Sequence, residues 1–190
     1  MRLRVQDVLG LPDSANPHRW YAPDDVLRVV DHVTADLKAI DPANAAAYEA
    51  QRASFLDAGL ARYRSLLDAI RRDFAGAPVG ATESLVAPLV DALGLRLISP
   101  ASFLNAIAEG ADPTPQDKTA METQIRQRQI RVLLVNRQNM TPDVQRLVEA
   151  AHASQVPVVE VTETPPEQAS FQDWQVTQLQ ALADALRASR

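Results

Sequence analysis

The sequence predicts an α/β protein: a four-stranded parallel sheet flanked by helices and preceded by a long spanning helix. Two observations lead to this fold class. After Gly76, four short apolar runs alternate with helical segments, which is typical of parallel βαβ units with right-handed crossovers. Before Gly76, the stretch from about residue 43 to residue 74 contains no proline and a single glycine, which favours one long helix.

The long segment also has helical periodicity. Its apolar positions step by four and three residues alternately: Leu56, Leu60, Tyr63, Leu67, Ile70 and Phe74. At about 1.5 Å per residue the helix would run to more than about 40 Å, which exceeds what a compact sheet layer needs. Such a helix either spans two lobes or forms a coiled-coil seam. The seam would cover too few clean heptads, so the spanning helix is favoured.

The apolar runs after Gly76 define the predicted sheet. The strands are expected at residues 77–81, 95–98, 130–135 and 156–161, and the helices at about 84–93, through 103–107, and at about 115–127, 142–154 and 171–186. The third and fourth runs are almost continuously apolar, as strands buried on both faces are.

The N-terminal part contains a short strand pattern and one amphipathic helix. Leu3–Leu9 alternates apolar and polar residues and is interpreted as a strand, but no second strand follows nearby to pair with it. This suggests a chain cut from something longer. Pro23–Ile40 is predicted to be an amphipathic helix, with Pro23 in its first turn. We therefore divide the chain into residues 1–22, a helical segment 23–75 and an α/β lobe 76–190.

Composition excludes several functions. The 190 residues carry a formal net charge of −5 with both signs interspersed, so no nucleic-acid partner is expected. There are no cysteines, which excludes disulfides and thiolate metal sites. No apolar run approaches the roughly 20 residues that span a bilayer. Residues 1–8 lack an apolar core of signal-peptide length, so no export signal is expected in the chain as written.

One short loop, Asn16–Tyr21, contains a histidine that is a candidate ligand. Pro17 removes a backbone donor and biases Asn16 towards an extended conformation, so His18 is expected on an exposed, stiffened loop outside any helix. Trp20 follows two residues later. A histidine held in this way can present a ring nitrogen to a ligand, although it can equally bond only its own loop.

Acidic residues follow two of the predicted strands. Thr82-Glu83 comes after the first strand and Thr162-Glu163 after the fourth, and ligands of open parallel sheets bind beyond these carboxyl ends. Singly, Glu83 could serve only the helix dipole and Glu163 could be a solvated loop residue. Together with His18, the two carboxylates at neighbouring strand ends would form a first shell for Zn²⁺, Mn²⁺ or Fe²⁺.

These residues carry a resemblance to a known family. The chain resembles the C-terminal two-thirds of the cluster A-I, TroA-like substrate-binding proteins, the zinc and manganese receptors of bacterial ABC transporters. The landmarks occur in family order: Asn16-Pro17-His18-Arg19-Trp20-Tyr21, Asp41-Pro42-Ala43-Asn44, Ala81-Thr82-Glu83, Asp112-Pro113-Thr114-Pro115, Val161-Thr162-Glu163-Thr164 and Phe171-Gln172-Asp173-Trp174.

The resemblance implies two α/β lobes joined by a long rigid helix, with the metal bound between the lobes. His18, Glu83 and Glu163 match the family's second, third and fourth ligands by position, whereas the first belongs to an N-terminal lobe that this chain lacks. It further implies an ABC permease as partner, a divalent metal as the transported ligand, no organic cofactor, and a periplasmic or extracellular lipoprotein location in the parent family.

Two alternatives remain open. A metal-dependent hydrolase would use Glu83 or Glu163 as a base on metal-bound water, but no His-Glu-x-x-His motif or nucleophile elbow is present, and no catalytic residue is predicted. An interaction module would expose Leu56, Leu60 and Tyr63 of the long helix and pair with a second copy.

Overall fold

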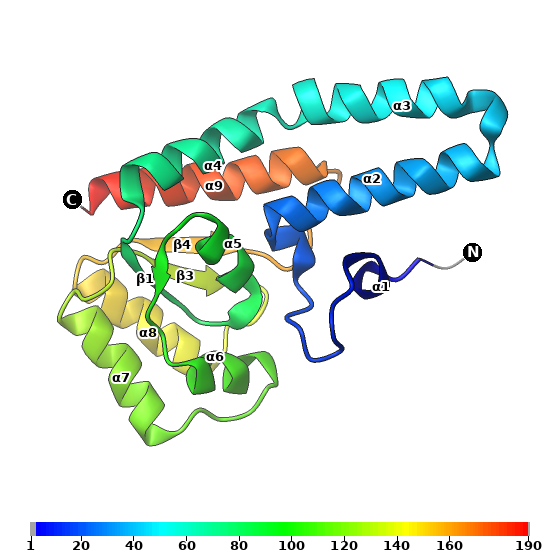
Figure 1. The fold of residues 1–190 in the computed structure, drawn as a ribbon. Coiled ribbons are helices and arrows are strands. Elements are labelled where there is room, and N and C mark those ends of the chain that lie inside the picture. The colour runs from blue at the N-terminus through cyan, green and yellow to red at the C-terminus, as the bar shows by residue number, and fades with distance from the viewer. Residues whose placement is uncertain (1–2, 190) are drawn as a thin grey trace.

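The computed structural model describes residues 3–189 and contains one parallel sheet (Figure 1). Its strands are β1 (Pro78–Ala81), β2 (Arg96–Leu97), β3 (Leu133–Asn136) and β4 (Val158–Val161), in the order β2-β1-β3-β4. All three strand pairings are parallel, which confirms the predicted α/β class. β3 is buried at every position, as its continuously apolar sequence predicts.

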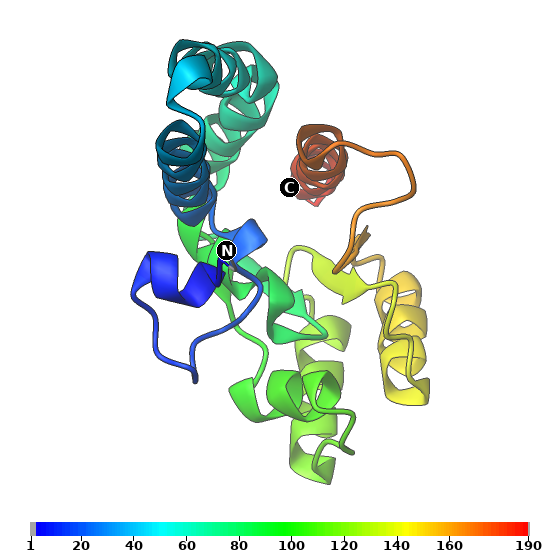
Figure 2. The ribbon, with the colours of Figure 1, turned by 90° about the vertical axis from the view of Figure 1, so that its right-hand side faces the viewer.

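Helices cover both faces of the sheet. Helices α4 (Ala61–Phe74) and α9 (Phe171–Ala188) lie side by side over one face, and α7 (Pro115–Arg126) and α8 (Pro142–Ala153) lie over the other (Figures 1 and 2). The shorter helices η4 (Ser84–Val86), α5 (Ala87–Ala92) and α6 (Ala101–Ala108) connect the first strands to α7. Helices α7, α8 and α9 each begin at a Thr or Ser whose hydroxyl accepts a hydrogen bond from the third helical N–H.

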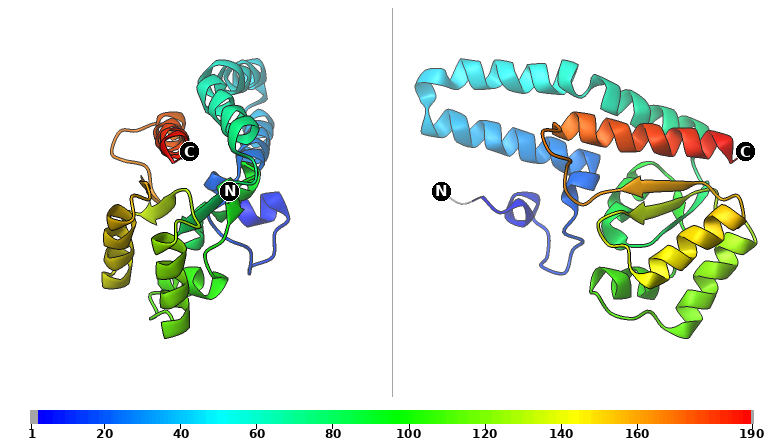
Figure 3. Two further views of the ribbon diagram at one scale, coloured as in Figure 1. Left: turned by 90° about the vertical axis from the view of Figure 1, so that its left-hand side faces the viewer. Right: turned by 180° about the vertical axis from the view of Figure 1, so that it is seen from behind.

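The segment before the sheet forms a projecting arm. Helices α2 (Pro23–Ile40) and α3 (Ala45–Ser54), joined by the turn η2 (Pro42–Asn44), run antiparallel and extend beyond the sheet (Figures 1 and 3). No residue of α3 is buried, and only Pro23, Asp25 and Thr34 of α2 are. The arm is therefore a two-helix layer without a core of its own.

The helix predicted over residues 43–74 is present but interrupted. Between α3 and α4 lies η3 (Phe55–Gly59), a single π turn in which the Leu60 N–H donates to the carbonyl five residues back, at 2.9 Å. A Cβ added at Gly59 would lie 3.2 Å from the Phe55 ring, so the glycine leaves room for that ring.

The strand predicted at Leu3–Leu9 is wrong. Val5–Leu9 forms the short helix α1, which Gly10 ends in the left-handed conformation with φ of 65°. The apolar residues Val5, Val8 and Leu9 are spaced three and four apart, which fits a helical stripe better than strand alternation. Leu9 is buried and α1 packs against α2, so no strand partner is needed.

One hydrophobic core joins the α/β part to the base of the arm, through Tyr21, Leu60, Tyr63 and Leu67. The expectation that Leu56, Leu60 and Tyr63 would form a free pairing face is wrong. Leu60 and Tyr63 are only 0% and 2% exposed, and Leu56 is partly buried against the same core. None of the described helices has the length and apolarity required to cross a membrane.

Candidate metal-binding site

The loop that carries His18 is fixed by Asn16. The Asn16 Oδ1 accepts hydrogen bonds from the His18 backbone N–H at 3.0 Å and lies 2.9 Å from the His18 Nδ1. The Asn16 Nδ2 donates to the Ser84 carbonyl at 2.7 Å, across the gap to the end of β1. Behind the histidine, Arg19 Nε donates to Asp25 Oδ2 at 2.7 Å and so ties the turn η1 (Arg19–Tyr21) to the first turn of α2. His18 lies outside any helix, as predicted, and these hydrogen bonds tie its loop to η4 and to α2.

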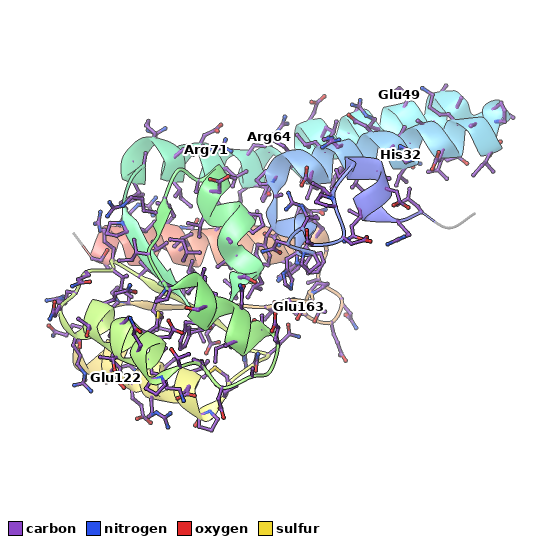
Figure 4. All side chains as sticks on the ribbon, turned by 60° about the horizontal axis from the view of Figure 1, so that its bottom comes forward. His32, Glu49, Arg64, Arg71, Glu122 and Glu163 are labelled. Atoms are coloured by element: carbon purple, nitrogen blue, oxygen red, sulfur yellow. The ribbon has the colours of Figure 1, made fainter. Side chains whose placement is uncertain are left out.

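His18 and Glu163 lie together. The His18 Nε2 is 3.4 Å from the Glu163 Oε1, and the two side chains are 14% and 49% exposed. The Trp20 ring packs edge-on against the imidazole, with 5.4 Å between centroids. Figure 4 shows Glu163 at the junction of the arm and the α/β part, whereas His32 lies out on the arm. An imidazole nitrogen and a carboxylate thus face each other at an accessible edge.

The backbone around Glu163 is held from both sides. The Gln138 Oε1 accepts from the Glu163 N–H at 2.6 Å and from the Thr164 N–H at 3.1 Å. Preceding Glu163, Thr162 accepts at its carbonyl from the Tyr21 hydroxyl at 2.8 Å and at its hydroxyl from Trp174 Nε1 at 2.8 Å. The acid therefore stands on a clamped loop with its side chain left accessible.

Tyr21 is the fully buried residue among those that hold the backbone around Glu163. Its hydroxyl also lies 2.8 Å from the Gln178 Oε1, which accepts from the Thr162 N–H at 2.9 Å. Burial raises the pKa of Tyr21 above its ordinary value, outweighing the opposite effect of the hydrogen bonds to Gln178 and Thr162. The ring is fully buried, so it connects the histidine loop to the end of β4 without facing solvent.

Glu83 has different surroundings. It is 6% exposed; Asn136 Nδ2 donates to its Oε2 at 2.7 Å, and Asn139 Nδ2 donates to its Oε1. The interpretation that Glu83 and Glu163 follow neighbouring strands is wrong, because β3 lies between β1 and β4 and places Asn136 between the two acids. The loop order in the sequence could not reveal that the third strand is inserted centrally.

The structure thus brings two of the three predicted residues into contact. In the part of the chain that the structure describes, no group of three or more His, Asp or Glu side chains is arranged to hold a metal ion. Glu83 is linked to the histidine loop indirectly, since Asn16 bonds the carbonyl of the next residue, Ser84. Of the supporting amides, Asn16 stands two residues before His18 in the sequence. Asn136 and Gln138 only end or follow the third strand, which is an ordinary place for polar residues.

The fold and the converging side chains define a class: a parallel α/β protein with its candidate ligands at the carboxyl edge of the sheet and in a preceding loop. The chain belongs to the family of the zinc-uptake complex component A, periplasmic (ZnuA), whose match spans residues 5–185. This is a transport-associated, metal-binding family and not an enzyme family. The resemblance to metal receptors is therefore confirmed at the family level.

Solved structures share the fold at low sequence identity. A Mn-bound mutant of the periplasmic metal-binding protein from Candidatus Liberibacter asiaticus matches with a TM-score of 0.72 and 16% identity, over 90% of this chain and 63% of that one. The Cd-bound form matches with a TM-score of 0.70 and 15% identity, over 98% and 67%. The SBP FpvC from P. aeruginosa, in complex with Ni²⁺, matches with a TM-score of 0.68 and 19% identity, over 95% of this chain and 66% of that one. The chain thus spans about two thirds of the length of these proteins. No curated protein matches it.

Proposed function

We propose that this chain binds a divalent metal, zinc or manganese, as the cargo of a bacterial ABC importer, with His18, Glu83 and Glu163 as ligands. The observation that supports it most is the 3.4 Å approach of His18 Nε2 to Glu163 Oε1. Two groups that can both donate lone pairs face each other, and a cation between them would be favourable. Family membership and the divalent metals bound by the similar structures support a divalent metal as the cargo.

Glu83 would be the third ligand. Its amide donors each occupy one lone pair of a carboxylate oxygen, and each oxygen has a second lone pair free for a metal. Amide donors behind a carboxylate orient it for binding a metal. Metal binding would draw Glu83 and the His18–Glu163 pair together, and water or donors outside these three residues would complete the coordination sphere.

The partner and the location follow from the same proposal. The importer would supply a membrane-embedded permease to which this chain delivers the metal, and delivery would take place in the periplasm or at the outer surface of the cell. The family's description as a periplasmic uptake component supports both points.

Calorimetric titration with Zn²⁺ and with Mn²⁺ tests the ligand set. We expect His18→Ala, Glu83→Gln and Glu163→Gln each to weaken binding by at least about tenfold. Two matched variants serve as controls: His32→Ala, a histidine on the arm paired with Asp36, and Glu122→Gln, a glutamate on α7 paired with Arg126. Equal affinity in all five variants would contradict the proposal.

An interaction role is the second candidate, and the arm favours it. Val33, Leu37 and Ile40 on α2 are 39%, 40% and 67% exposed. Their stripe continues into an apolar groove of about 340 Å³ lined by Trp20, Val26, Val30, Phe55 and Phe171, among others. Sedimentation velocity separates the two candidates. Self-association that the double substitution Leu37→Lys, Ile40→Lys abolishes would support the interaction role, and a concentration-independent monomer would exclude pairing through this stripe.

A further inference from the structure

The orientation of the Asn16 side chain is fixed by its own contacts. Its Nδ2 lies 2.7 Å from the Ser84 carbonyl, which can only accept a hydrogen bond. The amide nitrogen therefore points at Ser84 and the amide oxygen at His18. The backbone N–H of His18 confirms this assignment, because it donates to the same Oδ1 at 3.0 Å.

This orientation determines the histidine tautomer. The His18 Nδ1 lies 2.9 Å from Asn16 Oδ1, and since an amide oxygen can only accept, Nδ1 must carry the hydrogen. In the neutral imidazole the other nitrogen, Nε2, then has a free lone pair. That nitrogen is the one that faces Glu163, at 3.4 Å.

Asn16 also couples two distant loops. Ser84 follows Glu83 directly and begins the turn η4, so the Asn16–Ser84 bond joins the histidine loop to the glutamate loop across 68 positions in sequence. One side chain thereby sets the ring nitrogen that His18 presents and the position of the backbone beside Glu83.

We propose that Asn16 is a positioning residue for metal capture: it holds His18 in the Nδ1–H tautomer with Nε2 ready to ligate, and it holds the Glu83 loop at a fixed distance. This inference rests on the proposed metal-binding function for its consequence, but the tautomer can be measured in the metal-free protein.

The first experiment is long-range ¹H–¹⁵N NMR of histidine side chains at pH 9, without metal. The chain has only three histidines, and His18→Ala assigns the His18 signal. We expect protonated Nδ1 and unprotonated Nε2 in the wild type, and a shift towards protonated Nε2 in Asn16→Ala. Asn16→Asp retains an oxygen acceptor and should keep the wild-type tautomer. An unchanged tautomer in Asn16→Ala would overturn the inference.

The second experiment is Zn²⁺ titration of the same variants. Asn16→Ala should bind about 10- to 100-fold more weakly than the wild type, as expected when a ligating histidine loses the group that orients its ring. Asn16→Asp should lose less affinity than Asn16→Ala, because it keeps the tautomer. It should still bind more weakly than the wild type, because it cannot donate a hydrogen bond to the Ser84 carbonyl. The control is Asn105→Ala, an exposed asparagine on α6.

The outcomes separate the two proposals. Loss of binding in His18→Ala together with wild-type affinity in Asn16→Ala would overturn the positioning role and leave the ligand assignment standing. Wild-type binding in His18→Ala would instead remove the function, whatever the tautomer. A thermal unfolding curve checks that Asn16→Ala folds. If it does not, Asn16→Leu, which also lacks the acceptor oxygen, takes its place in both experiments.

Discussion

The buried tyrosines Tyr21 and Tyr63 differ in whether the hydroxyl group has a hydrogen-bond partner. The Tyr21 hydroxyl is hydrogen-bonded to the Thr162 carbonyl and lies 2.8 Å from Gln178 Oε1, whereas the Tyr63 hydroxyl has no hydrogen-bond partner among the described residues. A buried polar group without a partner costs about 1–3 kcal/mol, and a satisfied one contributes about 1 kcal/mol. The same substitution should therefore have opposite consequences at the two sites.

We predict that Tyr21→Phe lowers the free energy of unfolding by about 1–3 kcal/mol, because it leaves the Thr162 carbonyl without its donor. Tyr63→Phe should leave it unchanged or raise it by up to about 1 kcal/mol. Urea unfolding at pH 7 measures both. Equal destabilisation by the two substitutions would contradict the hydrogen-bond assignment.

The same tyrosines predict alkaline destabilisation. Burial is the largest cause of the raised pKa of both Tyr21 and Tyr63. Above the ordinary value of about 10 the unfolded chain loses these protons and the folded protein keeps them, so the unfolded state binds fewer protons and stability falls as pH rises. Each tyrosine contributes a slope of up to about 1.4 kcal/mol per pH unit, and none below pH 10.

Urea midpoints between pH 9 and pH 11.5 test this window. The phenolate absorbance of these two rings should appear together with unfolding and not before it. Tyr63→Phe should show a shallower decline in stability above pH 10 than the wild type, since one of the two buried groups is gone. Parallel curves for the two proteins would show that Tyr63 does not contribute.

At the residue scale, the sequence indicates candidate ligands but not their surroundings. The place of His18 in a proline-stiffened loop and of Glu163 after an apolar run indicates both residues, and the structure brings them into contact. Whether they bind metal stays a prediction. The amide clamps could not be foreseen, because Asn16, Asn136 and Gln138 act through folding partners between 25 and 68 positions away. Amides in loops are ordinary, and only tertiary contact distinguishes these.

At the element scale, β1 and the segment before β3 approach closely at a glycine. A Cβ on Gly80 would lie 2.8 Å from Ile130 Cδ1, and Ile130 is 2% exposed. The side chain has little room to move away, since well-packed cores tolerate extra methyl groups poorly. The glycine is therefore required by packing and not by backbone conformation.

We predict that Gly80→Ala destabilises the protein by about 1–3 kcal/mol through overpacking. Ile130→Val alone should cost about 0.5–1.5 kcal/mol. The double variant should lose less free energy of unfolding than the sum of the two single losses, because valine lacks the Cδ1 atom that the new methyl group would contact. Additive effects in urea unfolding would show that the core relaxes by another route.

The element-scale errors have local causes. The segment Leu3–Leu9 is short enough to fit both strand alternation and helical spacing. Gly10 distinguishes the two only once its left-handed conformation, which ends helix α1, is known. The predicted long helix has the right limits, but no residue pattern revealed the π turn at Phe55–Gly59. In that turn the Phe55 ring lies against Gly59, a contact that sequence periodicity does not indicate.

At the scale of the molecule, the arm and the α/β part differ in packing. Helix α3 buries no residue, whereas α4 and α9 are packed against each other over the sheet (Figure 1). Local opening requires little free energy where few apolar contacts are lost. The sequence periodicity indicated that both regions are helical. It could not show that α4 packs into the hydrophobic core whereas α3 packs mainly against α2.

We predict that amides of α3 and the distal half of α2 exchange with solvent much faster than those of α4 and α9. Hydrogen exchange followed by mass spectrometry measures this for the intact chain. The free energy of opening should lie well below the global value in the arm and near it in α9. Uniform protection along α2, α3 and α9 would indicate that the arm is stabilised by something other than its two-helix packing.

The root of α2 has a mechanical consequence. Pro23 follows η1 almost at once, and Arg19 bonds Asp25 in the first helical turn, so the histidine loop and the start of α2 are effectively one piece. The helix is 18 residues long, or about 27 Å at the usual rise. A tilt of about 5° at its root swings the far tip by about 2 Å. A small rearrangement around His18 would therefore produce a larger displacement at the tip of the arm, which a spin label placed there would detect.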